Sequence, residues 1–223
     1  MDLSPDRTKM LLACGAVAGP LFAVVALLQA FTRAGFDLTQ QQLSLLSNGD
    51  LGWIQAANFL LTGLLYVAGA IGMSRVLTTG PASTWGPRLI GIFGAGLVGA
   101  SAFGADPAFG FPPGTPAGYP TSVSWHGNVH LLVASVAFLA LIVACFVFSR
   151  RFRRAGRRLW AVGSIGAGVL LLVAFGANGA MPGQPVSTVG FTAAALLAFL
   201  WASAVSYSLL GDVAAGRRRD PVA

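Results

Sequence analysis

The sequence predicts an all-α membrane protein, a polytopic transmembrane bundle of six helices with both termini in the cytoplasm. Composition argues against a water-soluble fold, because 55% of the 223 residues are hydrophobic and only 9% are charged, whereas soluble domains usually carry about 25% charged residues. Six apolar stretches also reach the length of about 20 residues that a bilayer span requires. They are expected to form one transmembrane domain (1–223), with spans at about 10–32, 54–75, 87–105, 124–149, 159–178 and 187–211.

The basic residues predict which ends of the spans face the cytoplasm. Thirteen of the fourteen Lys and Arg residues lie at the N-terminus, in the links after the second and fourth spans, or in the tail 212–223. Cytoplasmic flanks carry such an excess, so the loops 33–53, 106–123 and 179–186 are expected outside. Ala, Gly and Arg are abundant and Lys is rare, a composition typical of a GC-rich bacterial genome. The expected location is therefore the inner (plasma) membrane of a bacterium.

The basic residues at the cytoplasmic flanks account for the net charge of +7. A nucleic-acid partner is therefore not needed to explain that charge. The six-arginine link SRRFRRAGRR (149–158) is interpreted as a topology determinant, with an anionic-lipid or partner site as the alternative. The first span is expected to be retained, because it is long and lacks a small-x-small cleavage site. Cys14 and Cys145 lie inside apolar runs, which predicts buried, reduced thiols rather than a disulfide framework.

The loop 33–53 combines polar residues with scattered leucines, which favours a short helix lying at the membrane interface. Asp37 is expected to cap the start of that helix, and Trp53 to lie at the level of the lipid headgroups. Together with the loop 106–123, this segment is expected to form a lid over the outer face.

Polar and small residues within the spans predict contacts between helices. Gln55 and Asn58 lie three residues apart, on one helical face; amides of this kind bond to a neighbouring helix or line a pocket. Small residues recur at spacings that permit close helix approach, although the many Gly and Ala residues also produce such spacings by chance. The positions are Gly15, Gly19, Gly91, Ala95, Gly96, Gly99, Ala100, Gly104, Gly163, Ala167 and Gly168.

An internal similarity relates the third and fifth spans. Residues 90–106 and 162–178 are identical at eight positions and end in an Asp/Asn pair. If this reflects duplication rather than composition, spans three–four and five–six are parallel helical hairpins, as in some transporters. Asp106 and Asn178 would then occupy equivalent positions at the outer rim.

The two histidines of the chain suggest a metal site. His126 and His130 lie four residues apart on one helix face, the spacing with which two imidazoles share one metal ion such as zinc. Asp106 is the candidate for a third ligand. The metalloprotease form of this spacing places Glu after the first His, but here that residue is Gly127, and no third His exists.

Two alternatives to the metal site are compatible with the sequence. The histidines could instead be hydrogen-bonded to Asn128, to Ser124 or to a loop carbonyl. A metal-free hydrolase would use an acid–histidine pair with a serine nucleophile; the candidate pairs are Asp106–His126 and Asp37–His130, and the candidate nucleophiles are Ser44 and Ser47. Proline after Asp106 ends the span, so this acid is expected at the aqueous edge, with Arg33 as a partner for one of the outer aspartates.

The polar residues converge on the outer face, which predicts an extracytoplasmic-facing polar pocket that binds a small molecule or a lipid headgroup. The expected pocket residues are Asp37, Ser44, Asn48, Gln55, Asn58, Asp106, His126, His130 and Asn178. Two alternatives compete with this function: a metal-dependent membrane hydrolase acting on a lipid-like substrate, and a structural or partner-binding scaffold. The inner halves of the spans contain almost no ionisable or amide side chains, which disfavours a transport path.

The chain resembles the small bacterial and archaeal membrane proteins catalogued as domain of unknown function 998. The resemblance rests on GPLF (19–22), LSLLSNGDLGWIQAANFLLTG (43–63), the Asp106–Pro107 pair and WHGNVH (125–130). It implies a six-span integral membrane protein and no particular reaction. A looser similarity, in residue types alone, is to the transmembrane hydrolases that include alkaline ceramidases. That pattern uses three histidines and seven spans, where this chain has two and six.

Overall fold

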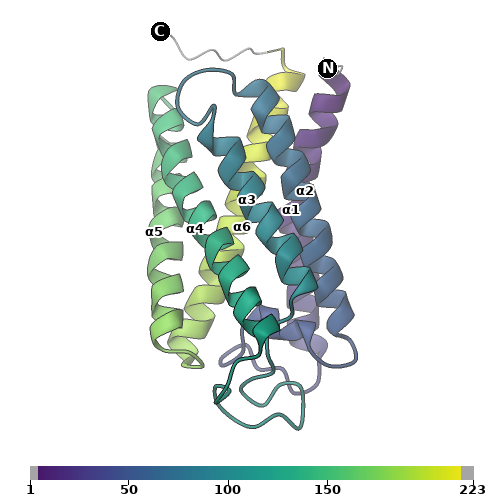
Figure 1. Cartoon of the computed structure of the whole chain (residues 1–223). Coiled ribbons are helices and arrows are strands. Elements are labelled where there is room, and N and C mark those ends of the chain that lie inside the picture. Colours follow the sequence, from purple (N-terminus) through teal and green to yellow (C-terminus); the bar gives the residue numbers. More distant parts are fainter. Residues whose placement is uncertain (1–4, 217–223) are drawn as a thin grey trace.

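The computed structural model describes residues 5–216, which form six α-helices, one short 3-10 helix and no named strand. The elements are α1 (Pro5–Thr32), η1 (Leu43–Ser47), α2 (Gly52–Val76), α3 (Trp85–Ala102), α4 (Trp125–Arg154), α5 (Arg158–Ala180) and α6 (Pro185–Ala214). Successive helices run in opposite directions, so α1 begins and α6 ends at the same end of the bundle (Figure 1). The predicted all-α bundle of six helices is confirmed.

Five of the six helices are long and apolar enough to cross a membrane, and α3 is the exception. It has only 18 residues, of which several are glycines, and Arg88 lies in its first turn. With so few residues, these polar and small ones keep α3 below the hydropathy that a span requires. Whether α3 spans the bilayer remains a prediction.

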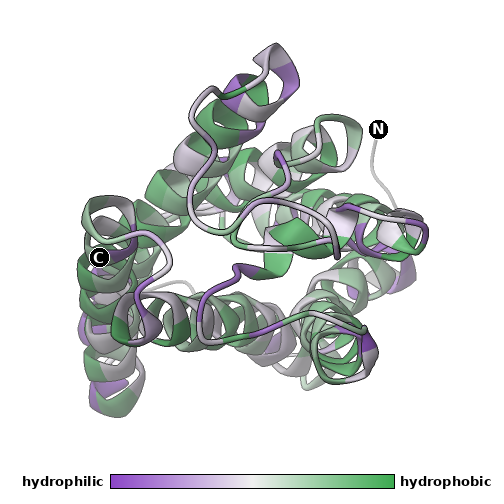
Figure 2. Ribbon diagram, turned by 90° about the horizontal axis from the view of Figure 1, so that it is seen from below, coloured by the Kyte–Doolittle hydropathy of each residue, from purple (hydrophilic) through white to green (hydrophobic). Residues whose placement is uncertain are grey.

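The helices form a ring in chain order. Each packs against the next, and α6 returns to pack against α1. Figure 2, seen from the end opposite the chain termini, shows the helices arranged around a centre that the connecting loops cross. We call this end of the bundle, where residues 33–51 and 103–124 lie, the loop end.

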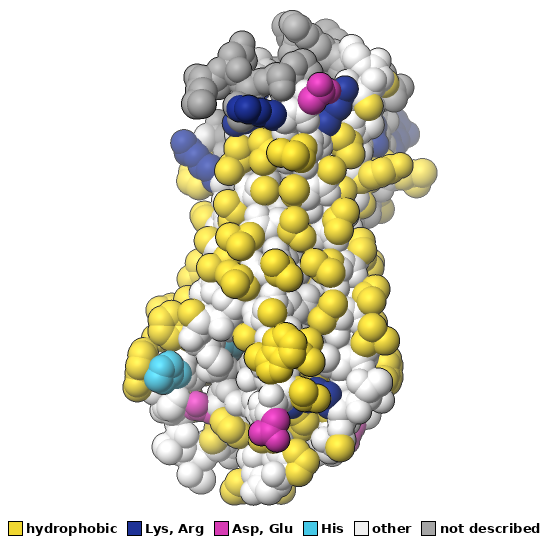
Figure 3. All heavy atoms as spheres, turned by 90° about the vertical axis from the view of Figure 1, so that its right-hand side faces the viewer, with side chains coloured by type: hydrophobic (Ala, Val, Ile, Leu, Met, Phe, Trp, Pro, Cys, Tyr) yellow, Lys and Arg dark blue, Asp and Glu magenta, His cyan; other side chains and the backbone are white. Residues whose placement is uncertain are grey.

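Charge is divided between the two ends of the bundle. Figure 3 shows most Lys and Arg side chains at the end opposite the loop end, beside an acidic side chain, with a band of hydrophobic side chains below them. Asp and His side chains lie at the loop end, together with a basic side chain. A band of this kind matches the lipid-facing surface of a membrane protein. Most basic residues therefore lie at one end of the bundle, as the prediction of a cytoplasmic end required.

Several helix ends differ from those expected. α3 ends at Ala102 rather than 105, because the chain becomes extended at Phe103. α4 continues to Arg154, five residues beyond the predicted end, and carries three arginines in its last turn. α6 continues to Ala214, so residues 212–214 are helical rather than part of the tail. Asp2 and the tail residues 217–223 lie outside the described residues.

The tightest packing joins α1, α2 and α6 near the middle of the bundle. A Cβ added to Gly69 would lie 2.7 Å from the Cα of Gly15, so only glycine permits this approach of α2 to α1. The Ser203 hydroxyl of α6 donates to the Gly15 carbonyl at 2.9 Å and accepts from the Gly19 N–H at 2.8 Å. The Ser203 hydroxyl therefore bridges two backbone groups of α1. The second of these belongs to Gly19, which directly precedes Pro20 within the helix.

The other predicted small-residue positions differ in how closely a neighbouring helix approaches them. A Cβ on Gly96 of α3 would approach Ala137 of α4 to 2.6 Å, and one on Gly168 of α5 would approach Cys145 to 2.9 Å. A Cβ on Gly163, by contrast, would meet nothing within 4 Å. Close approach of the backbones therefore occurs at some of these glycines and not at others.

Candidate functional site

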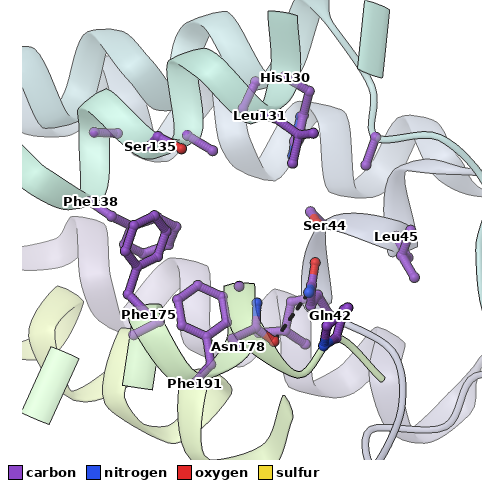
Figure 4. Close-up of a pocket in the computed structure, with 18 of the residues that line it drawn as sticks. Gln42, Ser44, Leu45, His130, Leu131, Ser135, Phe138, Phe175, Asn178 and Phe191 are labelled. Atoms are coloured by element: carbon purple, nitrogen blue, oxygen red, sulfur yellow. Dashed lines mark hydrogen bonds between the residues drawn. The ribbon is translucent and has the colours of Figure 1, made fainter. Parts of the chain in front are cut away.

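The bundle encloses a cavity of about 590 Å³ at its loop end. All six helices and both long outer loops contribute to its wall. Figure 4 shows the cavity between side chains of α4 on one side and of α5 and α6 on the other. Pockets that bind small ligands usually have volumes of about 300–1,000 Å³, so the cavity is large enough to be a binding site.

Aromatic rings form the inner end of the cavity. The Phe199 ring of α6 lies 4.6 Å from Phe22 of α1 and 4.8 Å from Phe93 of α3, measured between ring centroids. The Phe138 ring of α4 lies 5.1 Å from Phe191 and 5.7 Å from Phe175. The cavity is thus largely apolar, unlike the polar pocket that the sequence suggested, because the helices turn these phenylalanines toward the ring's centre.

Most polar lining residues lie nearer the loop end, whereas Ser135 lies beside Phe138 (Figure 4), and none of the described lining residues is Lys or Arg. The Gln42 amide donates to the Asn178 side-chain oxygen at 3.2 Å, joining the first outer loop to α5 (Figure 4). Ser44 and His130 line the cavity on the same side. Thr192 of α6 also lines it; this side chain is 8% exposed, and its hydroxyl has no hydrogen-bond partner.

Asp106 lines the cavity but its carboxylate is engaged with the start of α4. One oxygen accepts from the Ser124 N–H and the other from the Ser124 hydroxyl, both at 2.6 Å. The same hydroxyl accepts from the Gly127 N–H at 3.0 Å, which makes Ser124 the N-cap of α4. A carboxylate at a helix N-terminus is stabilised by the helix dipole, so Asp106 fixes the loop 103–124 to α4.

The two histidines point to different surroundings. The His130 ring is buried, and its Nδ1 lies 2.8 Å from the Phe103 carbonyl oxygen. The His126 ring is exposed and stacks on Trp125 with centroids 3.6 Å apart. Among residues 5–216, no group of three His, Cys, Asp or Glu side chains is arranged to hold a metal ion. The structure therefore does not bring His126, His130 and Asp106 together as a zinc site.

Several residues proposed for a metal-free hydrolase are engaged in other hydrogen bonds. The Asp37 carboxylate accepts from the Thr39 hydroxyl and N–H and from the Gln40 amide, so it caps a turn rather than η1. The Ser47 hydroxyl donates to the Ser44 carbonyl at 2.7 Å. No hydrogen bond joins a histidine to an aspartate among the described residues.

Five of the predicted pocket residues lie outside the cavity lining: Asp37, Asn48, Gln55, Asn58 and His126. Gln55 and Asn58 are buried at the contact between α2 and α1. The Gln29 amide of α1 donates to Gln55 Oε1 at 2.8 Å, and the Asn58 amide donates to the Phe22 carbonyl at 3.2 Å. These amides link two helices, one of the two roles that their spacing suggested.

The two outer loops hold each other in place across the loop end. The Arg33 guanidinium donates to the carbonyls of Leu46 and Asn48, and lies over the Phe111 ring at 5.0 Å from its centroid. Burial lowers the pKa of Arg33, and the nearby Asp50 opposes that shift. The predicted aspartate partner of Arg33 is thus an electrostatic neighbour, while its hydrogen bonds go to backbone carbonyls.

A buried glutamine adds a second link between the outer loops. Gln41 donates to the Phe109 carbonyl at 2.8 Å and accepts from the Asp37 N–H at 2.8 Å. The short helix expected in the first outer loop is present as η1, and its leucines are buried against the bundle. Its place at the membrane interface stays a prediction.

Asp106 and Asn178, the last residues of the internal similarity, both line the cavity but occupy different local structures. Asp106 lies in the loop after α3, whereas Asn178 lies within α5, which continues to Ala180. α3 and α5 do run in the same direction (Figure 1).

Sequence reasoning missed the aromatic wall, because the helices that carry these phenylalanines are apolar around most of their circumference. Isolated polar residues such as Gln55 and Asn58 do not mark which phenylalanines face the cavity, and the packing of each helix against its neighbours in the ring decides this.

Comparison with known proteins gives one match. The model of a family described as protein of unknown function (DUF998) matches residues 16–210. No curated protein and no solved structure matches the chain significantly. The family match covers most of the sequence and includes all six helices in whole or in large part, so the chain belongs to the DUF998 family of proteins.

Proposed function

We propose that this membrane protein binds an uncharged, slender amphiphile in the loop-end cavity, with the apolar part against the phenylalanines and the polar part toward the loops. The observation that carries this proposal is the lining: eight phenylalanines, seven of them in the helices, with polar groups placed mainly toward one end. Apolar surface removed from water contributes about 25 cal/mol per Å², so the aromatic wall favours the tail of a ligand. The proposed ligand therefore carries an apolar chain in addition to the headgroup that the sequence predicted.

The charges around the cavity favour an uncharged headgroup. A phosphate or carboxylate would require basic partners, and the described lining contains no Lys or Arg. Arg33, the basic residue of the loop end, is directed to the carbonyls of Leu46 and Asn48. The lining instead offers His130, Asn178, Ser44 and Thr192, which suit hydroxyl, amide or ester groups.

The cavity also favours this function over a scaffold. A scaffold whose polar outer groups pair only with one another would need no cavity at this end. The hydrolase alternative has less support, since among the described residues no group of three His, Cys, Asp or Glu side chains could hold a metal ion, and the His130 Nδ1 contacts the Phe103 carbonyl rather than a carboxylate.

We further propose that all six helices cross the membrane, with both termini in the cytoplasm and the loop end outside, in the inner membrane of a bacterial cell. The basic end opposite the cavity supports this orientation (Figure 3). The ligand would then occupy the half of the protein within the outer leaflet.

Binding of a radiolabelled monoacylglycerol to purified protein in lipid nanodiscs tests the proposal. Ala195→Phe places a ring in the cavity, whereas Ala193→Phe adds the same ring on the exposed side of the same helix. We expect the wild type and Ala193→Phe to bind, and Ala195→Phe to bind at least about tenfold more weakly. Absence of saturable binding by the wild type, or equal binding by both variants, would contradict the proposal.

A further inference from the structure

The wall of the cavity is incomplete between α4 and α5. Most lining residues are buried or half-buried, but Leu131 of α4 is 47% exposed, and Gly176 and Gly179 of α5 are exposed as well. Tyr119 and Pro182, which line the cavity at the loop end, are also exposed and mark a second gap there. A residue that lines a cavity and also reaches the outside of the bundle marks an opening. We call the gap bordered by Leu131, Ser135, Gly176 and Gly179 the lateral opening.

The opening arises because α4 and α5 diverge toward the loop end. Gly168, Phe175 and Gly179 are separated by seven and four residues, so they lie on one face of α5. A Cβ on Gly168 would lie 2.9 Å from Cys145 of α4, and Phe175 still reaches Phe138 with centroids 5.7 Å apart. A Cβ on Gly179 would meet nothing within 4 Å. The face of α5 that contacts α4 thus loses that contact beyond Phe175, as the two ribbons separate in Figure 1.

The lateral opening lies at the depth of lipid acyl chains. Trp125, the first residue of α4, is 64% exposed, as expected of an indole at the headgroup level. At a rise of 1.5 Å per residue, Leu131 and Ser135 lie about 9 Å and 15 Å further along the helix. The hydrocarbon core is about 30 Å thick, so these residues fall within one leaflet.

The outer loops narrow the alternative route from water, which Tyr119 and Pro182 border. The Gln42–Asn178 hydrogen bond joins the first loop to α5. Phe109 of the second loop packs on Gly183 between α5 and α6, where an added Cβ would overlap its ring. Gln41 in turn binds the Phe109 carbonyl. These contacts fasten the loops over the mouth that faces away from the membrane.

We infer that the ligand moves between the cavity and the outer leaflet through the lateral opening, without leaving the bilayer. This inference rests on the proposed function and adds where the ligand comes from. The ligand is a single-chain, uncharged amphiphile dissolved in the membrane. Leu131 and Ser135 form one edge of its path, and the absent side chains of Gly176 and Gly179 form the other. The headgroup stays at the loop end while the chain passes sideways toward the phenylalanines.

Photolabelling in phosphatidylcholine vesicles tests this path. Protein-containing vesicles are mixed with vesicles carrying a trace of monoacylglycerol with a diazirine in its chain, and labelled peptides of α4 and α6 are quantified over time. The double variant Gly176→Leu/Gly179→Leu fills one edge of the opening, and Ser135→Phe fills the other. Gly163→Leu is the matched control, because Gly163 is exposed on the same helix, also has nothing within 4 Å of an added Cβ, and does not line the cavity.

We expect both opening variants to slow labelling by about tenfold or more, equivalent to about 1.4 kcal/mol on the barrier, while Gly163→Leu behaves as wild type. Gln41→Ala, which removes a hydrogen bond between the outer loops and does not line the cavity, should leave the rate unchanged. Wild-type labelling of the cavity with an undiminished rate in either folded opening variant, or a rate that rises only in Gln41→Ala, would overturn the lateral path. Absence of cavity labelling in the wild type at equilibrium would instead overturn the proposed function.

Discussion

The Asp106 carboxylate accepts two hydrogen bonds from Ser124, one from its N–H and one from its hydroxyl, each of 2.6 Å. This pair joins the loop after α3 to the first turn of α4. It depends on Gly127, because a Cβ at that position would overlap the carboxylate. Gly127, which stands where a zinc-protease motif has its general base, thus leaves room for the Asp106 carboxylate.

Gly127→Ala should destabilise the protein, because the methyl group would displace the Asp106 carboxylate from the N-cap of α4. Overpacking of this kind costs about 1–3 kcal/mol, which outweighs the gain of up to about 1 kcal/mol from placing alanine in a helix. The midpoint of thermal unfolding in detergent measures the change. Gly163→Ala supplies the comparison, since its methyl meets nothing within 4 Å, and it should be neutral or stabilising. Equal midpoints for the two variants would contradict this account.

Ser203→Ala should weaken the contact between α6 and α1. It removes the hydroxyl that lies between the Gly15 carbonyl and the Gly19 N–H. Hydrogen bonds between membrane helices contribute about 0.6 kcal/mol on average and up to about 1.7 kcal/mol, so we expect a loss in that range in a denaturant titration. Ser206→Ala is the control, because the Ser206 hydroxyl donates within its own helix, to the Ala202 carbonyl, and should cost less.

Thr192→Val should have opposite effects on stability and on ligand binding. The Thr192 hydroxyl lines the cavity without a hydrogen-bond partner, and a buried unpaired group costs about 1–3 kcal/mol. Its replacement by a methyl should therefore stabilise the unliganded protein. Binding of the monoacylglycerol should weaken by about tenfold if the headgroup pairs with this hydroxyl.

Thr188→Val separates these two effects. The Thr188 hydroxyl is also buried without a partner, but Thr188 does not line the cavity. It should gain stability while its affinity for the ligand stays at the wild-type value. A similar loss of affinity in both valine variants would show that the Thr192 hydroxyl does not contact the ligand.

Acid should loosen the turn that begins at Asp37. Hydrogen bonds from the Thr39 side chain and backbone hold the pKa of this carboxyl below its usual value. The turn is therefore stabilised above the unfolded pKa of about 3.9, and this contribution is lost as the pH falls through the lower, folded value. Hydrogen exchange of residues 37–41, corrected for the intrinsic rate, should rise on acidification below about pH 4. Asp37→Asn should show no such step.

Thiol labelling should place the two ends of α3 on opposite sides of the membrane. Thr78→Cys precedes α3 and Ala117→Cys follows it, and both side chains are exposed. In a background without Cys14 and Cys145, an impermeant maleimide added to intact cells should label Ala117→Cys, and should label Thr78→Cys only after permeabilisation. Labelling of both from outside would show that α3 does not cross, and would leave five spans.

The sequence by itself determined the helical class, the existence of all six helices and the division of charge between the two ends. Hydropathy and charge act locally along a chain, so a run of about 20 apolar residues and its basic flanks already carry this information. The Gln55–Asn58 pair was interpretable for the same reason, because polar groups inside a span need partners on another helix.

Only the tertiary structure decided which residues surround the cavity. His126 and His130 share a helix face in sequence, yet one ring lies buried against the Phe103 carbonyl and the other is exposed on Trp125. Phe138 and Phe191 meet because α4, α5 and α6 follow one another around a ring. Helices apolar on every side do not specify by composition which side faces inward, and close packing across the ring settles this instead.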